Sequence, residues 1–571
     1  MSDRMQPIPF SALINWITRE VKSGTLFGCR NFYTAEPEKK ISILGREIET
    51  PIGPAAGPHT QLAQNLLTAY VCGGRYFELK TVQQLDGEDL TVSKPCILAE
   101  DEGYNCEWST ELTVEQAFEE YVKAWYLMQV LARELKLGAP GAVVFNMSVG
   151  YNMEGIQSPK IDRFIEQLKD ASACPVFLQC REVLEQHLQD FSLFTREDLD
   201  AVSPHICSSM TLSTMHGCPA DEIERIVTYL LTEKGLNTYL KCNPTLLGYE
   251  RVRSMLDALG YDYVAFDESQ FQADLQLEEA IAMLQRLQDT AREAGVLFGV
   301  KMTNTFPVKA QNRELPDPMM YMSGKALLPL SLGAAEIISR SFDGKLPISY
   351  SGGADALNIE AIFETGIRPI TICTDLLKPG GYHRLNTMAK KLSGHTYWGE
   401  EKGTDTKKIE ALVKEILSGT RTRKMTPFSI QRQLPEIPCE CKEQCHTVCG
   451  CCVTVCPNRA NVLIHTVSGN KMLHLDGLCN ECGNCASFCI EKSAPYLEKF
   501  TLFQSEADME ASQNGGFTRK EGEKSCYLLR CGAGRMEYRA GENSSGVPEA
   551  VREIIDAVDE EYEYLFYLKK N

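Results

Sequence analysis

Short apolar runs alternate with longer amphipathic segments between residues 51 and 375. The short runs are typical of strands buried on both faces, and the longer segments, such as 221–235 and 278–295, are typical of helices that pack on a sheet. This alternation predicts an α/β fold with parallel strands, either a (β/α)8 TIM barrel or an open doubly wound sheet. A barrel has eight places, so we expect either 261–267 or 296–304 to lie outside the ring. The nine candidate strands are 51–57, 75–81, 142–149, 206–213, 238–244, 261–267, 296–304, 346–353 and 368–375.

The segments on either side of this region have patterns of their own. Phe10, Leu13, Ile14 and Ile17 fall on one face of a short helix, which we expect to pack on the body of the protein. Towards the C-terminus, a charged helix leads into a basic, proline-containing linker, and strand-like pieces precede an acidic helix. The predicted domains are a barrel with an N-terminal helical extension (1–400), a helix and linker (401–438), a cysteine-rich module (439–497) and a small α+β region (498–571).

Length and charge exclude several classes of function. With 571 residues, two or three domains are expected. The net charge of −19 argues against nucleic acid as a partner. No run of eighteen apolar residues exists, so we expect no membrane span, and the N-terminus has no apolar segment followed by a cleavage site. We therefore expect a cytoplasmic protein.

The chain has 23 cysteines, and eleven of them fall between Cys439 and Cys489. Clustered cysteines without an export signal indicate a metal site rather than disulfides. The later group follows the C-x2-C-x2-C-x3-C spacing of bacterial ferredoxins, whose fourth cysteine binds the other cluster. The earlier group ends in the same way, but its expected first position is His446. The first ligand is then Cys445 with a one-residue bulge, or else His446, Cys441 or Cys451.

Cross-ligation of the two groups predicts two [4Fe-4S] clusters, and a pair of structural zinc sites is the alternative. Such clusters relay single electrons, so the chemistry on a substrate is expected upstream, in the barrel. The predicted ligands are Cys445, Cys449, Cys452 and Cys489 for one cluster and Cys479, Cys482, Cys485 and Cys456 for the other.

Several residues at predicted strand ends fit a phosphate-bearing cofactor. Gly352 and Gly353 follow one strand and precede a helical segment, where barrels commonly hold a phosphate on backbone N–H groups. Thr374, after the next strand, can supply a hydroxyl to the same phosphate. The alternative is an ordinary glycine turn.

Lysines also end apolar strands, at Lys80 and Lys241. A lysine there is costly to bury unless it meets an anion or a polarised carbonyl. Lys301 also ends a strand and is the alternative to Lys241 for contact with the anion or polarised carbonyl. Surface lysines with buried stems are the alternative for all three.

Ten short motifs occur in one order: PIGPAAG, FELKT, YNCEW, VVFNMSVGYN, TLSTMHGCP, LKCNPT, MTNT, SGKALLPLSL, YSGGAD and ITICTD. Together they resemble the FMN barrel of dihydroorotate dehydrogenases and, more closely, the C-terminal half of dihydropyrimidine dehydrogenases, where a two-cluster ferredoxin module also follows the barrel. The resemblance covers roughly residues 45–495. Over the whole chain the sequence is similar to the bacterial flavin/iron–sulfur subunits named after selenate reductase.

Longer members of that last group have a further domain for FAD and a nicotinamide. This chain has no GxGxxG between a strand and a helix. The resemblance therefore implies electrons from a separate protein, an NAD(P)H-dependent flavoprotein or a ferredoxin, within a hetero-oligomer.

The resemblance also implies which residues contact FMN. In the family, the opening strand contributes backbone contacts to the flavin, and lysines at two strand ends contact the ring, where a cation favours the reduced anionic flavin. These positions are Ala55, Ala56, Gly57, Lys80 with its neighbour Thr81, and Lys241.

Substrate contacts in the pyrimidine enzymes are asparagines and a threonine, whose groups match alternating C=O and N–H on a ring. By motif these positions are Asn105, Asn304 and Thr305, while Asn146 matches a flavin- or substrate-facing asparagine of the dihydroorotate enzymes. One further family asparagine is Thr211 here, so the ring is expected to be related to uracil without being uracil.

The catalytic acid is expected on the loop after the fourth strand, residues 213–219. Reduction of a ring double bond needs a hydride on one atom and a proton on its neighbour. Cys218 is favoured because a thiol has a pKa nearer neutrality than an unassisted hydroxyl. Thr214, at the family's acid position, is second and His216 third, and a loop cysteine without a role is the alternative.

Three functions follow from these features. The first is FMN-dependent reduction of a C=C or C=N bond in an imide-like heterocycle, such as an oxopurine (uric acid) or a pyrimidine. The second is reduction of an oxyanion such as selenate, and the third is a non-catalytic electron-transfer subunit. We expect the first, because a pocket lined by asparagines suits a ring better than an oxyanion.

Overall fold

The computed structural model describes residues 4–106, 109–213, 216–395, 403–419, 449–532, 534–542 and 546–567. The chain forms two compact units. The first contains Met1–Asn31, Leu377–Gly381 and Gln431–Asn571, and the second contains Phe32–Leu376 and Tyr382–Ile430. The first 31 residues therefore group with the C-terminal region and not, as we expected, with the barrel.

Eight parallel strands form the centre of the second unit. They neighbour one another in the order β3-β14-β13-β10-β9-β8-β7-β4. The backbone N–H of Arg75 donates to the carbonyl of Ile52 (2.9 Å), which joins the two end strands β4 and β3. This near-closed ring confirms the (β/α)8 TIM barrel and rejects the open sheet. The strands are β3 (Ile52–Pro54), β4 (Tyr76–Glu78), β7 (Val144–Gly150), β8 (Ser209–Ser213), β9 (Asn237–Cys242), β10 (Phe298–Met302), β13 (Ile348–Ser351) and β14 (Ile370–Ile372).

The extra run of the sequence is 261–267, because the sixth barrel strand is β10. Its apolar residues are buried in an aromatic cluster instead of the ring. Phe266 lies 4.9 Å from Phe306 and 5.4 Å from Tyr249, measured between ring centroids. Ala265 makes an isolated bridge to Lys309, so the segment is extended without being a barrel strand. A short apolar run cannot by itself distinguish these two environments.

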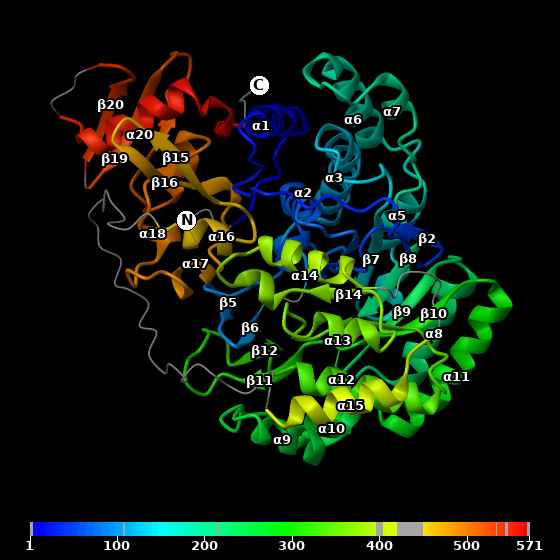
Figure 1. The fold of residues 1–571 in the computed structure, drawn as a ribbon. Helices are drawn as coiled ribbons and strands as arrows, with labels where there is room; N and C mark the ends of the chain where they lie inside the picture. The colour runs from blue at the N-terminus through cyan, green and yellow to red at the C-terminus, as the bar shows by residue number, and fades with distance from the viewer. Residues whose placement is uncertain are drawn as a thin grey trace. The chain divides into compact units, whose positions relative to one another are not determined.

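Helices follow the strands and surround the ring (Figure 1). The helix predicted at 221–235 is α8, the one at 278–295 is α11, and the charged helix after residue 400 is α15. The principal helices of this unit are α2 (Ala63–Val71), α3 (Val114–Glu134), α5 (Pro159–Lys169), α6 (Pro175–Gln186), α8 (Ala220–Thr232), α9 (Tyr249–Ala258), α10 (Glu268–Ala273), α11 (Leu277–Ala294), α12 (Leu328–Ser341), α13 (Ile359–Glu364), α14 (His383–Ser393) and α15 (Thr406–Leu417).

A second, antiparallel sheet is built from loops at one end of the barrel. Its strands are β5 (Ile97–Ala99), β6 (Glu102–Asn105), β11 (Phe306–Lys309) and β12 (Met319–Gly324), in the order β11-β12-β6-β5. The first pair comes from the chain after β4 and the second pair from the chain after β10. Both excursions leave the carboxyl ends of parallel strands, the end at which barrel enzymes hold their active sites.

The first unit contains a six-stranded sheet that joins the cysteine module to the C-terminal region. The strands are β15 (Asn461–Thr466), β16 (Gly469–Leu475), β17 (Thr501–Leu502), β18 (Gly516–Arg519), β19 (Cys526–Cys531) and β20 (Gly534–Arg539), in sequence order. Two helices of this unit are α1 (Phe10–Lys22) and α20 (Glu549–Glu560). Trp16 of α1 packs on Phe27 and on Tyr564, and the Arg459 Nε donates to the carbonyl of Phe27 (2.8 Å). The N-terminal helix therefore packs against the C-terminal residues of this unit.

Closure of the barrel depends on the absence of a side chain at Gly53. A Cβ there would lie 1.7 Å from the carbonyl oxygen of Tyr76 on the neighbouring strand. We predict that Gly53→Ala lowers the free energy of unfolding of the barrel by about 2–3 kcal/mol, because the two backbones must separate. Gly394→Ala is the control, since its Cβ would meet only the Lys391 carbonyl at 3.4 Å. Equal melting temperatures for the two variants would contradict the tight closure.

Candidate functional site

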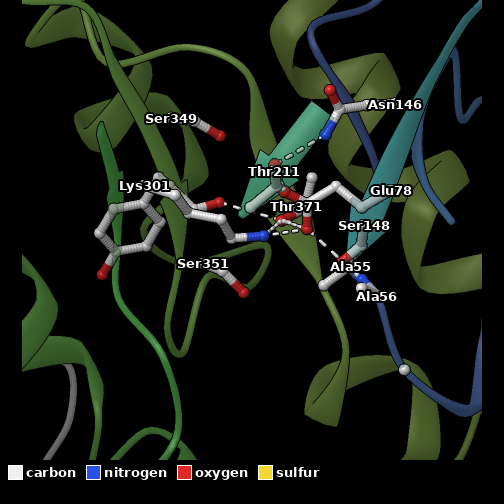
Figure 2. Close-up of polar contacts among 12 residues, drawn as sticks. Ala55, Ala56, Glu78, Asn146, Ser148, Thr211, Lys301, Ser349, Ser351 and Thr371 are labelled. Carbon is white, nitrogen blue, oxygen red and sulfur yellow. Dashed lines mark hydrogen bonds and ion pairs between the residues drawn. The ribbon is translucent and has the colours of Figure 1, made fainter. Parts of the chain in front are cut away.

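A buried ion pair lies inside the barrel, at the carboxyl ends of the strands. Glu78 of β4 and Lys301 of β10 form a salt bridge, and each side chain is 1% exposed. The Lys301 Nζ also donates to the Thr371 hydroxyl of β14 (3.1 Å) (Figure 2). Burial lowers the pKa of Lys301, and Glu78 opposes that shift. Lys301 therefore has a carboxylate partner in the protein, unlike the role considered for it from the sequence.

Glu78 joins further strands through its other contacts. Its Oε1 accepts from the Thr211 hydroxyl of β8 (3.4 Å), and Thr211 in turn accepts from the Asn146 Nδ2 of β7 (2.7 Å). The backbone N–H of Ala56, after β3, donates to Glu78 Oε2 (3.4 Å). Figure 2 shows these groups converging on the carboxylate. One glutamate thus connects residues of β3, β7, β8, β10 and β14.

The sequence interpretation did not identify Glu78. It stands two residues before Lys80 in the motif FELKT, and a glutamate between apolar strand residues was the available signal. Ala55 and Gly57 also differ from the expectation that their backbone groups contact the flavin. The Ala55 N–H donates to Ile372 and the Gly57 N–H to the Thr60 hydroxyl (3.3 Å), so both are occupied within the protein.

Lys241 has positive neighbours in this network. Its pKa is lowered to about 8, because burial, Lys301 and Lys80 together outweigh the opposing effect of Glu78. Lys80 is 3% exposed and Thr81, whose hydroxyl contacts Ser148 (2.8 Å), is 8% exposed. Because the Glu78 carboxylate is already paired with Lys301, this end of the barrel favours an added anion or an electron-rich ring.

Glycines from two strand ends come together next to Thr374. Gly353 has a left-handed backbone (φ 69°), as does Gly324 at the end of β12 (φ 74°). A Cβ at Gly353 would lie 2.5 Å from the Gly324 carbonyl oxygen, and one at Gly352 would lie 2.2 Å from the Ser331 hydroxyl. The Thr374 hydroxyl is 2.7 Å from that of Ser323. Gly353 therefore lies against Gly324 and Thr374 against its neighbour Ser323, and neither Ser323 nor Gly324 had been assigned from the sequence.

Two of the four candidate substrate residues have buried carbonyl groups without a partner in the described part of the chain. These are Asn105 Oδ1, at the end of β6, and Asn146 Oδ1, inside the barrel. Asn304 Nδ2 donates to Asn243 Oδ1 (3.2 Å), and its own Oδ1 accepts from the Thr305 N–H (3.0 Å). Asn146 belongs to the Glu78 network, whereas Asn105 and the chain after Thr305 enter the antiparallel sheet on either side of β12.

The candidate acids on the loop after β8 have different environments. Thr214 lies outside the described residues. Burial, then Glu222 and Asp221, raises the pKa of Cys218 to about 11, which makes this thiol a weaker proton donor than we expected. His216 Nδ1 lies 2.9 Å from Asp274 Oδ2, and His216 Nε2 is buried without a hydrogen-bond partner among the described residues.

Asp274 keeps its negative charge although it is buried. Burial raises its pKa, but hydrogen bonds from His216, Thr245 and the Gly217 N–H outweigh this effect, and the pKa is lowered. A small pocket is lined by Asn243, Thr245 and Lys241. Asp274, Asn243 and Thr245 were not predicted from the sequence.

Cysteines of the two predicted groups lie near one another in the first unit. Burial and then Cys456 and Cys485 raise the pKa of Cys479, so Cys456 of the earlier group lies with the later group. Burial, Cys449 and Cys489 raise the pKa of Cys451, so Cys489 lies with the earlier group. Backbone N–H groups donate to Cys456 Sγ (3.2 Å) and to Cys479 Sγ (3.3 Å), contacts that also tune cluster potentials. The thiols therefore fit iron–sulfur ligation.

The burial of the eight predicted ligands differs between the two groups. Cys452, Cys456, Cys479, Cys482 and Cys485 are buried, Cys489 is intermediate and Cys449 is exposed. Cys445, and with it His446 and Cys441, lies outside the described residues, so the choice of the first ligand stays open.

The second unit is thus a (β/α)8 barrel with buried lysines and amides and a glycine turn at the carboxyl ends of its strands. The family model "Oxidoreductase YgfK, N-terminal TIM-barrel domain" matches residues 27–424. The chain therefore belongs to the YgfK oxidoreductase family.

Two curated relatives come from Escherichia coli, strain K12 and O157:H7, and both are described as "Putative oxidoreductase YgfK". Each is 49% identical over 439 residues, which cover 74% of this chain. The match spans 42% of the length of each relative, so this chain corresponds to less than half of those proteins.

Solved structures from Eimeria tenella also match. Ligand-free dihydroorotate dehydrogenase has a TM-score of 0.41 and 15% identity, covering 70% of this chain and 97% of its own. The same enzyme in complex with ferulenol has a TM-score of 0.39 and 14% identity, covering 68% and 91%. These likenesses are too distant to support an argument about the site.

No helix in the described ranges is both long and apolar enough to cross a membrane.

Removal of the Glu78 charge tests the central ion pair. We predict that Glu78→Gln lowers the free energy of unfolding by about 3–5 kcal/mol, because Lys301 is left buried without its counter-ion. Glu224→Gln is the control: it breaks a bidentate surface pair with Arg286 and is expected to cost less than about 1 kcal/mol. Denaturant unfolding of both variants measures the difference. Similar losses in the free energy of unfolding would contradict a structural role for Glu78.

The lowered pKa of Lys241 predicts a pH dependence of stability in flavin-free protein. A lysine whose folded-state pKa is about 8 lowers the free energy of unfolding below pH 8, because its charge is unfavourable in the folded protein. This loss of stability disappears as the pH rises towards the ordinary pKa of about 10.4. We expect Lys241→Met to melt at a higher temperature than the wild type at pH 7, and the gap to narrow by pH 9.5. A gap independent of pH would show that the buried charge is not its cause.

Proposed function

We propose that this oxidoreductase binds FMN in the barrel and two [4Fe-4S] clusters in the cysteine module, and reduces a C=C or C=N bond of an imide-like heterocycle. An oxopurine such as uric acid, or a pyrimidine, has the required ring. The electrons come from a partner protein. The observations that support this proposal most are the positive, half-buried strand end at Lys241 and the glycine turn at Gly353.

The two features fit different parts of one cofactor. The turn at Gly324 and Gly353, with the Ser323 and Thr374 hydroxyls, suits a phosphate, because any Cβ at Gly353 would collide with backbone. The lysines suit the flavin ring, since an electron-rich ring relieves the repulsion that lowers the pKa of Lys241. When bound and reduced, the flavin would supply the hydride.

The asparagines suit a ring with alternating C=O and N–H groups. The unpartnered carbonyl of Asn105 can accept from a ring N–H, and an amide N–H can donate to a ring carbonyl. Asn304 is held by Asn243, which fixes the direction in which its amide points. A buried carbonyl without a partner costs free energy, and a ring N–H that satisfies it would be selected over an analogue without one.

The clusters fit electron delivery rather than substrate chemistry. Their ligands belong to the first unit, whereas the lysines, the glycine turn and the asparagines belong to the second. A separate electron donor, an NAD(P)H-dependent flavoprotein or a ferredoxin in a hetero-oligomer, would reduce the clusters.

Reduction of an oxyanion such as selenate is the competing function, because the positive charge around Lys241 would also attract an oxyanion. Selenate reduction leaves the unpartnered amide carbonyls of Asn105 and Asn146 without a function, because an oxyanion has no N–H to donate to them. An electron-transfer subunit without its own substrate is the third reading.

An anaerobic assay distinguishes these functions. The purified protein is reduced with dithionite, and uric acid, uracil and selenate are added separately while the flavin absorbance is followed. We expect reoxidation by a heterocycle and not by selenate. Reoxidation by selenate alone would overturn the proposal, and no reoxidation without a second protein would favour the electron-transfer subunit.

Loss of the glycine turn is expected to remove the flavin and leave the clusters. Gly353→Ala should weaken FMN binding at least tenfold, because the added Cβ would lie 2.5 Å from the Gly324 carbonyl oxygen. Gly235→Ala is the matched control, with a similar left-handed backbone (φ 62°) and open space around its Cβ. Flavin released by acid and iron content per chain measure the outcome. Equal flavin content in both variants would place the phosphate elsewhere.

A further inference from the structure

Asp274 is a buried carboxylate in the short connection between α10 and α11. It is 5% exposed, and its two oxygens accept four hydrogen bonds from two different parts of the chain. The donors and distances are His216 Nδ1 (2.9 Å), the Gly217 N–H (2.6 Å), Asn243 Nδ2 (3.1 Å) and the Thr245 hydroxyl (2.7 Å).

These contacts connect the ends of three consecutive barrel strands. His216 and Gly217 belong to the loop after β8, and Asn243 and Thr245 follow β9. Asn243 also accepts from Asn304, which follows β10. One carboxylate thus holds the candidate proton-donating loop directly. It also holds a candidate substrate amide, that of Asn304, through Asn243.

The loop is shaped to make this contact. Gly217 has a left-handed backbone (φ 79°), which turns its N–H towards Asp274, and no atom lies within 4 Å of where its Cβ would be. The His216 side chain is 25% exposed, and its Nε2 is buried without a partner within the described ranges. A histidine held at Nδ1 by a carboxylate has a fixed tautomer and presents Nε2 for proton transfer.

We propose that Asp274 is the positioning residue of the proton-donating loop, and that the donor it positions is His216 rather than Cys218. This inference rests on the proposed reduction of a ring double bond. One ring atom receives a hydride, and with it the electron pair, from the reduced flavin. The Nε2–H bond of the His216 imidazolium breaks as a bond from hydrogen to the neighbouring ring atom forms. The neutral imidazole keeps its Nδ1 proton, which stays hydrogen-bonded to Asp274.

Other charged groups surround the loop without touching the imidazole. Asp221 and Glu222 lie at the start of α8, beside Cys218, and Lys241 of β9 lines the small pocket next to Asn243 and Thr245. In the described part of the chain, Asp274 is the group that hydrogen-bonds the His216 ring. Its removal should therefore alter the titration of His216 more than removal of either neighbouring carboxylate.

The test compares Asp274→Asn with Asp267→Asn. Asp267 lies at the N-terminal end of α10, whereas Asp274 lies at its C-terminal end, and it pairs with Lys309 at the surface, so its variant controls for general disturbance of this segment. The protonation of His216 is followed by hydrogen–deuterium exchange at ring C2 with mass spectrometry, which needs no substrate. The second readout is the pH profile of flavin reoxidation by the heterocycle that the wild type accepts.

We expect the imidazolium form of His216 to be less stable in Asp274→Asn than in the wild type, because the ring loses the counter-charge that contacts it at Nδ1. The imidazolium is the active form, so the rate falls as the pH rises through the His216 pKa. Loss of the carboxylate then moves this falling limb to lower pH, and the rate at neutral pH drops at least tenfold. His216→Asn should show a similar loss, and the double variant no further loss. Asp267→Asn should leave the midpoint and the limb in place.

An unchanged His216 midpoint in Asp274→Asn would overturn the inference. A shifted midpoint with an unshifted pH–rate profile would also overturn it, because the donor would then be another group, such as Cys218. If the midpoint shifts but no heterocycle reoxidises even the wild-type flavin, the proposed function fails, and donation by His216 fails with it. The Asp274–His216 coupling would stand in that case. Iron content and melting temperature of each variant show whether it has folded.

Discussion

The ion pair between Glu78 and Lys301 is the constraint on which the carboxyl end of the barrel depends. Two charges buried to 1% exposure are tolerated only because they face one another and because Thr211, Thr371 and the Ala56 N–H complete the hydrogen bonding. The pair fixes residues of several strands around one carboxylate. It also uses that carboxylate, so Lys241 is left in a positive environment. The same interaction therefore stabilises the barrel and leaves a positive charge that a bound anionic or electron-rich cofactor would neutralise.

Different strand ends and loops around this pair provide different parts of the proposed binding site. Strand ends β12 and β13 and the residue after β14 provide the glycine turn and hydroxyls. The loops that form the antiparallel sheet provide Asn105 and the chain after Thr305. The connection between β9 and β10, with its two helices, provides Asp274, which reaches back to the loop after β8. Each task thus depends on a different excursion from the same end of the barrel, as in other barrel enzymes.

The sequence predicted the barrel well, because eight of nine apolar runs became its strands. It could not choose between 261–267 and 296–304, since an apolar run in an aromatic cluster has the same local pattern as a buried strand. Gly352, Gly353 and Thr374 could be placed after strands, because strand ends can be read from the sequence. Glu78 and Asp274 were missed because their importance comes from partners 22 to 293 residues away, which no local pattern encodes. The preference for Cys218 rested on the ordinary thiol pKa, and burial beside Asp221 and Glu222 changes that value.

The central claim is that the positive strand ends and the glycine turn together hold one FMN. An experimental structure of the anaerobically prepared protein with FMN added tests it most directly. The account predicts the ring against Lys80 and Lys241, and the phosphate at Gly324, Gly353 and Thr374. Flavin bound in full stoichiometry at another place, with these residues contacting only protein, would contradict it.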